Sequence, residues 1–337
     1  MQFINNLRGL AILLIVATHA VSTLPSLGLI GEFIDYFVGG ATLLFMAISG
    51  YVFQTALPGF RYLPYLKSKA IYVGVPYLVL SLPANLLYVL GLKGDHPWID
   101  MAAFAQMGVL EKCVLLVFTG AGLGPLWFIP MIGIFYLAAP LFSGLSRLKL
   151  VLPAFILACG LAVWVGRPPL NDQPFQAFIF FIPAYLLGML LSANKFTLER
   201  SGSTLLPIFC AYLIAYGLAF IGLKLSGITP DRTGTMLFYL PIIVLLFGVF
   251  QQFFRRKDIW LDLFARLSFF IFFIHGYFAA LIRSVFAKLV DGNGSLYPVL
   301  EVPLIVAAFV SMLALSILTY LVLKLCLRER SRLIIGG

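Results

Sequence analysis

The stretch INNLRGLAILLIVATHA, Ile4 to Ala20, is apolar enough to cross a membrane, yet it contains Arg8 near its start and His19 near its end. A charged group in the hydrocarbon core is costly unless it reaches water, pairs, or faces the interior of a bundle. Eleven residues of helix make three turns plus roughly 20°, so both side chains project from one face, roughly 16 Å apart along the axis. The stretch therefore predicts a first transmembrane helix that marks two depths of one internal passage.

Composition extends this prediction to the whole chain. Of its 337 residues, 62% are hydrophobic and 11% are charged, and the mean hydropathy is +1.04. A soluble domain contains about 25% charged residues. Apolar runs near 20 residues recur throughout, which predicts an all-α, polytopic transmembrane helix bundle and excludes the short alternating segments of a membrane β-barrel. We expect one integral-membrane domain over residues 1–337. The four scattered cysteines predict neither a disulfide framework nor a metal site.

The apolar runs give about ten predicted spans. They are Leu7–Leu24, Phe33–Ala56, Ala70–Leu92, Pro125–Phe142, Leu150–Gly166, Phe175–Ala193, Thr204–Lys224, Met236–Phe254, Leu267–Leu289 and Val302–Cys326. The shorter run Val109–Thr119 is typical of a re-entrant or interfacial helix. Loops on one side contain 15 lysines and arginines against 6 on the other. This imbalance places both termini in the cytoplasm and accounts for much of the +10 charge without a nucleic-acid partner.

The polar groups of the first helix suggest chemistry. A buried histidine tends to stay neutral, because burial disfavours the charged ring, and a neutral imidazole can take a proton from a hydroxyl as a general base. Its second nitrogen needs an orienting acceptor, for which Asp35 and Glu32 are candidates by depth. Two plainer interpretations remain open: Arg8 as a topology marker, and His19 as a core histidine bonded to a backbone carbonyl.

Six segments, in order, resemble the membrane acyltransferase-3 family. They are LRGLAILLIVATHA, with an arginine followed by a histidine, GGATLLFMAISGYVF, YLKSKAIYVGVPYLVLS, LGPLWFIPMIGIFYLAAPLF, FFIPAYLLGMLL and LSFFIFFIHGYF. The resemblance covers nearly the whole chain and fits the span count. One departure is that the family often has arginines where this chain has Lys67 and Lys69, and lysine lacks the two-pronged grip of arginine on phosphate.

The resemblance implies a stand-alone integral-membrane O-acyltransferase of the bacterial cytoplasmic (inner) membrane. Such a protein takes an acyl group, usually acetyl, from cytoplasmic acyl-CoA and delivers it to a hydroxyl of an extracytoplasmic or lipid-linked glycan. Acetyl-CoA is then the donor co-substrate, and no metal is needed. The expected partners are acyl-CoA, a glycan acceptor such as an exopolysaccharide or a lipid-linked saccharide, and membrane lipid. A homo-oligomer remains open, and no nucleic acid is expected.

The resemblance and the charge map together assign roles to particular residues. The predicted catalytic residues are His19 and Arg8, and the predicted substrate-binding residues are Asp35, Glu32 and His275. The predicted donor-binding residues are Arg8, Arg61, Lys67, Lys69 and Trp127. An uncharged pantetheine arm would run between Arg8 and His19, where nothing ionises. For His275 a helix-packing hydrogen bond, and for Trp127 a core aromatic role, remain alternatives.

Two other classes of function remain. A secondary transporter or flippase could use the same intramembrane arginine and histidines as gating groups, although the spans show no half-to-half symmetry. A structural subunit would leave the shared face of Arg8 and His19 unexplained. No serine elbow or cysteine beside a base is visible, which favours direct transfer over a covalent acyl-enzyme.

Overall fold

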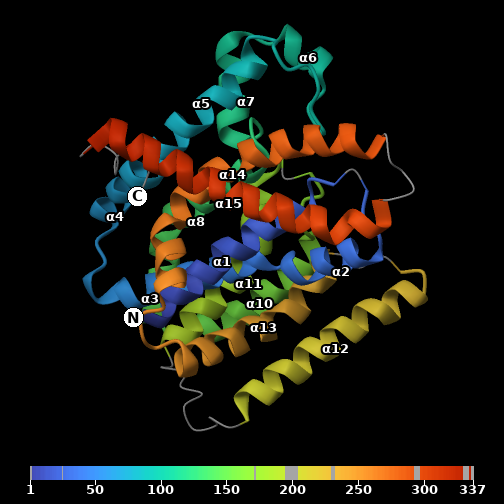
Figure 1. Ribbon diagram of the computed structural model, residues 1–337. Helices are drawn as coiled ribbons and strands as arrows, with labels where there is room; N and C mark the ends of the chain where they lie inside the picture. Colours follow the sequence, from blue (N-terminus) through green and yellow to red (C-terminus); the bar gives the residue numbers. More distant parts are fainter. Residues whose placement is uncertain are drawn as a thin grey trace.

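The computed structural model describes residues 2–24, 26–170, 172–193, 204–228, 232–291, 297–328 and 334. All the regular structure in these ranges is helical (Figure 1). The α-helices are α1 Gln2–Val21, α2 Leu29–Val38, α3 Ala41–Ala56, α4 Tyr62–Lys69, α5 Val75–Val89, α6 Met101–Gln106, α7 Val109–Thr119, α8 Phe128–Leu137, α9 Ala139–Arg147, α10 Val151–Val165, α11 Pro174–Ala193, α12 Leu205–Leu225, α13 Arg232–Phe253, α14 Ile259–Asp291 and α15 Tyr297–Leu327. Short 3₁₀ turns lie at Leu57–Gly59 and Gly124–Trp127, and a π turn, Ala70–Gly74, joins α4 to α5.

The predicted membrane bundle is confirmed. Within the described ranges, eight helical segments are long and apolar enough to cross a membrane, with α2–α3 and α4–α5 each acting as one span. The pair α7 and α8 passes the same test together but bends by 76°, so it is either a broken span, which would be the ninth, or a re-entrant loop. The fifteen-residue helix α10 is also apolar. These segments agree with a bundle of about ten spans.

Helix boundaries differ from the prediction where polar contacts extend or break a helix. The prediction Pro125–Phe142 for one span is wrong, since a 3₁₀ turn, α8 and α9 replace it, with a break at Ala138. Helix α14 begins at Ile259, eight residues before the predicted start, because Asp262 forms ion pairs with Lys257 and Arg266 that make a polar first turn stable. The predicted short helix Val109–Thr119 is confirmed as α7.

Helices α1 and α14 run side by side in the same direction at the centre of the bundle (Figure 1). Arg8 contacts Ala265 near the start of both helices, and His19 contacts His275 further along both. The backbones meet at Gly9, where a Cβ atom would lie 2.1 Å from the Leu261 carbonyl oxygen. Only a residue without a side chain permits this approach, which fixes the register of the pair.

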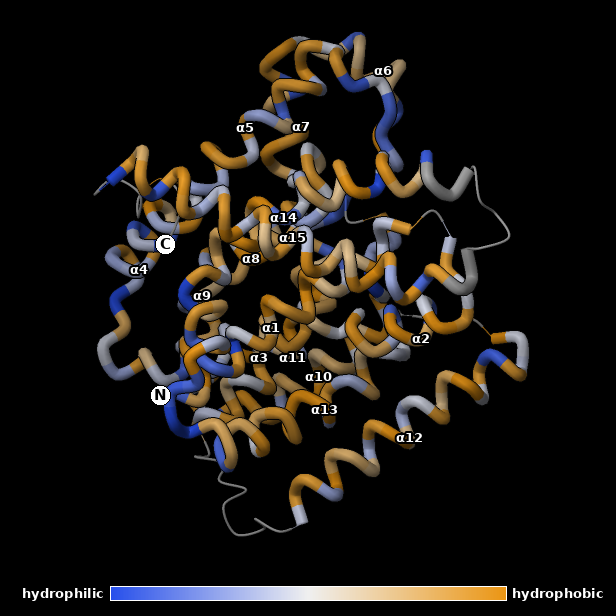
Figure 2. Tube along the Cα trace, in the orientation of Figure 1, coloured by the Kyte–Doolittle hydropathy of each residue, from blue (hydrophilic) through white to orange (hydrophobic). Residues whose placement is uncertain are grey.

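Hydropathy along the chain fits a bundle that crosses a membrane. Apolar residues fill the middle of the helices, and polar residues gather at their ends, near α4 and the N-terminus on one side and near α6 on another (Figure 2). Helix α12 lies at the edge of the bundle (Figure 1), with apolar side chains such as Ile214 and Leu218 more than 60% exposed. Such a surface is stable only against lipid.

Candidate functional site

His19 opens into a cavity of about 320 Å³, here called the His19 cavity. Its wall includes the loop between α7 and α8 and the start of the loop after α5. The lining residues are His19, Tyr88, Lys93, His96, Pro97, Trp98, Thr119 to Pro125, Trp127, Pro169, Leu170, Gly276, Ala279, Ala280 and Arg283. The end of α1 is held there by Thr18, whose hydroxyl donates to the carbonyls of Leu14 and Val38, each at 3.0 Å.

A second histidine lies against His19. The ring centroids of His19 and His275 are 5.0 Å apart, with the planes tilted by 57°. His275 is fully buried, and its Nδ1 lies 2.7 Å from the carbonyl oxygen of Ile271, one turn earlier in α14. Its Nε2 is buried with no hydrogen-bond partner among the described residues. The structure therefore brings together the two intramembrane histidines that the sequence places on separate helices.

The loop after α5 closes the cavity through His96. Its Nδ1 accepts from the N–H of Ile99 at 3.1 Å, and its Nε2 lies 3.1 Å from the Ala121 carbonyl oxygen. The ring contacts Trp98 edge-on, with centroids 4.6 Å apart. Burial lowers the pKa of His96 below its ordinary value, so the neutral ring that these bonds require is favoured near pH 7.

Arg8 lies in the interior but does not line the His19 cavity. Its Nη2 donates to the Ala265 carbonyl at 2.6 Å, and its Nε is buried without a partner among the described residues. Ile12 and Ile15 lie between Arg8 and His19 on the shared face, and both are buried, at 0% and 7% exposure. Packed side chains therefore fill the face of α1 on which the sequence predicts an open passage, and α3, α14 and α15 all pack against this helix.

The basic residues of α4 differ in their surroundings. Arg61 and Lys67 are exposed. The ammonium group of Lys69 lies over the rings of Tyr65 and Tyr136, 5.4 and 5.2 Å from their centroids. Lys69 also lines a groove of about 630 Å³ between α5, α7 and α8, here called the side groove.

The side groove and the His19 cavity have one wall residue in common. Thr119, the last residue of α7, lines both. The groove is thus bordered by Lys69 at the end of α4 and reaches the edge of the His19 cavity at Thr119. Of the α4 residues predicted to bind the donor, Lys69 is the one that the structure places beside such a route.

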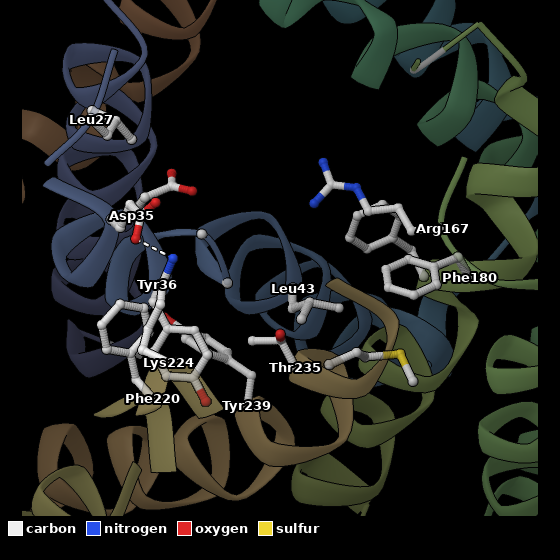
Figure 3. A pocket seen from close by; sticks show the side chains of 15 residues that line it. Leu27, Asp35, Tyr36, Leu43, Arg167, Phe180, Phe220, Lys224, Thr235 and Tyr239 are labelled. Atoms are coloured by element: carbon white, nitrogen blue, oxygen red, sulfur yellow. Dashed lines mark ion pairs between the residues drawn. The ribbon is translucent and has the colours of Figure 1, made fainter. Parts of the chain in front are cut away.

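A third cavity, of about 220 Å³ and here called the charged cavity, contains the two predicted carboxylates. Glu32 forms an ion pair with Lys224, and Asp35 lies across the opening from Arg167 (Figure 3). The wall also contains five aromatic residues, Tyr36, Phe180, Phe181, Phe220 and Tyr239. Neither carboxylate lines the His19 cavity.

Trp127 separates the two cavities on this side. It lines the His19 cavity and is 8% exposed. Its ring stacks on Phe181, which lines the charged cavity, with centroids 5.8 Å apart. The guanidinium of Arg167 lies 5.7 Å from the Trp127 ring centroid. Trp127 is thus a largely buried residue in the wall of the His19 cavity, and its contact with a ligand stays a prediction.

Several wall residues of the His19 cavity escaped prediction. The loop Thr119 to Pro125 and Arg283 come from segments that carry no acid–base motif. One signal was present in the sequence, because GAGLGP combines three glycines and a proline directly after an apolar run. Such a combination is typical of a break in a helix where the backbone approaches a cavity.

Comparison with known proteins identifies the family of the chain. No curated protein and no solved structure matches the chain. A family model described as an acyltransferase domain matches residues 1–321, nearly the whole chain. A multi-pass helical bundle with paired intramembrane histidines and a match of this length identify the chain as a member of the acyltransferase-3 family, and so as a membrane acyltransferase.

Proposed function

We propose that this acyltransferase moves an acetyl group from cytoplasmic acetyl-CoA to a hydroxyl of an extracytoplasmic or lipid-linked glycan at the bacterial inner membrane. His19 acts as the general base. The observation that carries the proposal is the opening of His19 into a cavity beside a buried second histidine. The distribution of lysines and arginines predicts that this cavity faces the outer side. Membership of an acyltransferase family supports acyl transfer, not transport, as the chemistry that we propose for that cavity.

The transfer is direct in this proposal. The hydroxyl oxygen of the acceptor attacks the thioester carbonyl, forming a carbon–oxygen bond, while its proton passes to the neutral ring of His19. The carbon–sulfur bond then breaks, and the proton passes from His19 to the departing sulfur. No step consumes an oxidant, a reductant or a metal.

The donor reaches this cavity through the side groove. The phosphates of CoA lie at the cytoplasmic side, near Lys69 and with Arg61 and Lys67 around them, and the arm extends toward Thr119. Lys69 has no ion-pair partner among the described residues, which leaves its charge available for an anion. Arg8 contributes an unused donor, Nε, in the interior near the cytoplasmic ends of α1 and α14.

The charged cavity supports an acceptor role for Glu32 and Asp35. Carboxylates, cations and aromatic rings around a small cavity are the groups that hold hydroxyl-rich ligands in proteins. Trp127 and Phe181 form the wall toward His19, so an acceptor with more than one sugar unit could contact both cavities. In this arrangement Glu32 and Asp35 bind the acceptor and take no part in the proton transfer.

Replacement of the base tests the function. The His19→Ala protein, purified in lipid nanodiscs, should consume acetyl-CoA with kcat reduced by about 10²–10⁴-fold and a KM close to that of the parent, as expected for a lost general base. Ser22→Ala, one turn further along and exposed, is the matched control and should keep the parental rate. Thiol release and acetylated product are the measurements. A parental rate in the His19 variant would remove the proposed mechanism.

Replacement of Lys69 tests the donor route. Lys69→Gln should raise the KM for acetyl-CoA roughly tenfold with little change in kcat, the effect of one lost charge-assisted hydrogen bond. Arg147→Gln, an exposed cation at the end of α9, is the control for a general loss of cytoplasmic positive charge. Equal KM changes in the two variants would mean that the side groove is not the donor route.

A further inference from the structure

We propose that His275 is a positioning residue whose Nε2 accepts a hydrogen bond from the ring N–H of His19. This bond would turn the other nitrogen of His19 toward the reacting hydroxyl. The inference rests on the proposed function, in which His19 is the base. In this arrangement His275, and not Asp35 or Glu32, orients the His19 ring. His275 then has a role other than holding the thioester carbonyl.

The tautomer of His275 follows from its backbone contact. Nδ1 lies 2.7 Å from the carbonyl oxygen of Ile271, and a carbonyl oxygen can only accept. Nδ1 must therefore carry the hydrogen. A neutral histidine has one ring N–H, so Nε2 is an acceptor and cannot donate to a thioester carbonyl or an oxyanion.

The surroundings of Nε2 point to His19 as the donor. The ring of His275 is fully buried, and Nε2 has no partner among the described residues. Among the residues that the structure describes, two aromatic rings contact the ring of His275. The ring of Phe272, with its centroid 6.1 Å away, offers no polar hydrogen, whereas the ring of His19, at 5.0 Å, does. An acceptor left unpaired in the interior costs free energy, and a hydrogen bond from His19, formed when its ring turns toward Nε2, would remove that cost.

The register of α1 and α14 keeps the two rings in reach. Gly9 packs against the backbone at Leu261, and Arg8 donates to Ala265. Asn6, earlier in α1, donates to the carbonyls of Phe254 and Arg256 at 2.9 and 2.8 Å, just before α14 begins. Three contacts near the cytoplasmic ends therefore set how His19 and His275 meet near the opposite ends.

A neutral partner suits the location. When His19 takes the proton of the acceptor hydroxyl, its ring becomes positive, and the bond to His275 Nε2 stabilises that N–H and spreads the charge. A carboxylate would do the same but would add a charged group to the interior of the membrane, where it is costly. The proton then leaves with the sulfur of CoA, and His275 stays neutral throughout.

Two polar variants separate this role from a packing role. Glutamine places its amide near the position of Nε2, and asparagine places its amide near Nδ1. His275→Gln should keep most of the parental kcat for acetyl-CoA consumption. His275→Asn should lose about 10–100-fold, the usual cost of removing an orienting partner, with an unchanged KM for acetyl-CoA. If His275 served only to donate to the Ile271 carbonyl, His275→Asn would stay active and His275→Gln would lose activity. That result would overturn the proposal.

A second measurement is independent of turnover. Diethylpyrocarbonate modifies the free nitrogen of neutral histidines, and peptide mass spectrometry gives the rate at His19 in each variant relative to the parent. Modification of His19 should slow several-fold in His275→Asn and stay near the parental rate in His275→Gln. Equal rates in all three proteins would overturn the inference. A parent that modifies as expected but never consumes acetyl-CoA would instead contradict the proposed function.

Discussion

At the scale of single residues, the site depends on one glycine that contributes no chemistry. Gly9 lets α1 approach α14 so closely that any Cβ would meet the Leu261 carbonyl. Side chains that repel at this point would move the helices apart, and the displacement would reach His19 and His275. Small residues at helix contacts thus control the geometry of polar groups far along the same helix.

This dependence predicts the effect of a single methyl group. Gly9→Ala should lower the free energy of unfolding by about 1–3 kcal/mol, since overpacking forces the backbones to shift. It should also reduce kcat by more than it changes the KM for acetyl-CoA. Thermal unfolding in nanodiscs and steady-state kinetics are the measurements. Gly160→Ala, in α10 with open space around its Cβ position, is the control and should be neutral or slightly stabilising.

At the scale of elements, the bent pair α7–α8 forms much of the wall around His19. The two helices meet at 76°, and the connecting loop lines the cavity. Gly120 has a positive φ of 72°, and Gly122 contacts the side chain of Asn85. Irregular backbone is tolerated at membrane depth where it lines a cavity, because water or ligand can satisfy its polar groups.

The loop held by His96 predicts a pH dependence for this element. Nδ1 accepts from Ile99, so a proton at Nδ1 removes that bond. Burial lowers the pKa of His96, so the closed loop binds fewer protons than the open loop, and closure weakens as pH falls through the ordinary histidine value of about 6.5. Lys93 lowers that pKa further, whereas the Ala121 contact and Asp95 raise it.

Hydrogen exchange measures this closure. Amides of Trp98, Ile99 and the loop 120–123 should lose protection between pH 7.5 and 5.5, after correction for intrinsic exchange. His96→Asn keeps an acceptor near Nδ1 and cannot titrate, so its protection should be nearly independent of pH. The same pH response in the parent and the variant would show that another group controls the loop.

Sequence patterns predicted the helices better than they predicted the side-chain contacts between helices. Hydropathy gave the spans, and the eleven-residue spacing gave the shared face of Arg8 and His19. The closeness of His275 to His19 was not predictable from the sequence. The depth of His275 depends on where α14 begins, and its polar first turn lies outside the span that hydropathy predicts. The packed Ile12 and Ile15 were equally invisible, since an apolar stripe fits a passage and a core alike.

At the scale of the whole molecule, the path of the chain decides which side each cavity faces. With the N-terminus in the cytoplasm, an even number of spans, eight or ten, returns the C-terminus to the cytoplasm. Nine spans would leave it on the other side. The number of spans depends on two elements. Helix α10 is about 22 Å long against a hydrocarbon core of about 30 Å, and the pair α7–α8 is bent. Arg147 and Lys149 before α10, and Arg167 after it, sit at its two ends, as anchors of a short span would.

This path gives a prediction for both faces. In cells, a fluorescent reporter fused after Gly337 should be active only in the cytoplasm, and an epitope inserted between Gly91 and Asp95 should be reached by antibody from outside without permeabilisation. An epitope between Arg147 and Lys149 should need permeabilisation, and a second between Arg167 and Leu170 should not. That last pair isolates α10, because both sites would be on one side if α10 failed to cross. A C-terminal reporter found outside would place an odd number of spans in the membrane and would turn the α12–α15 half, with His275, against the direction of α1.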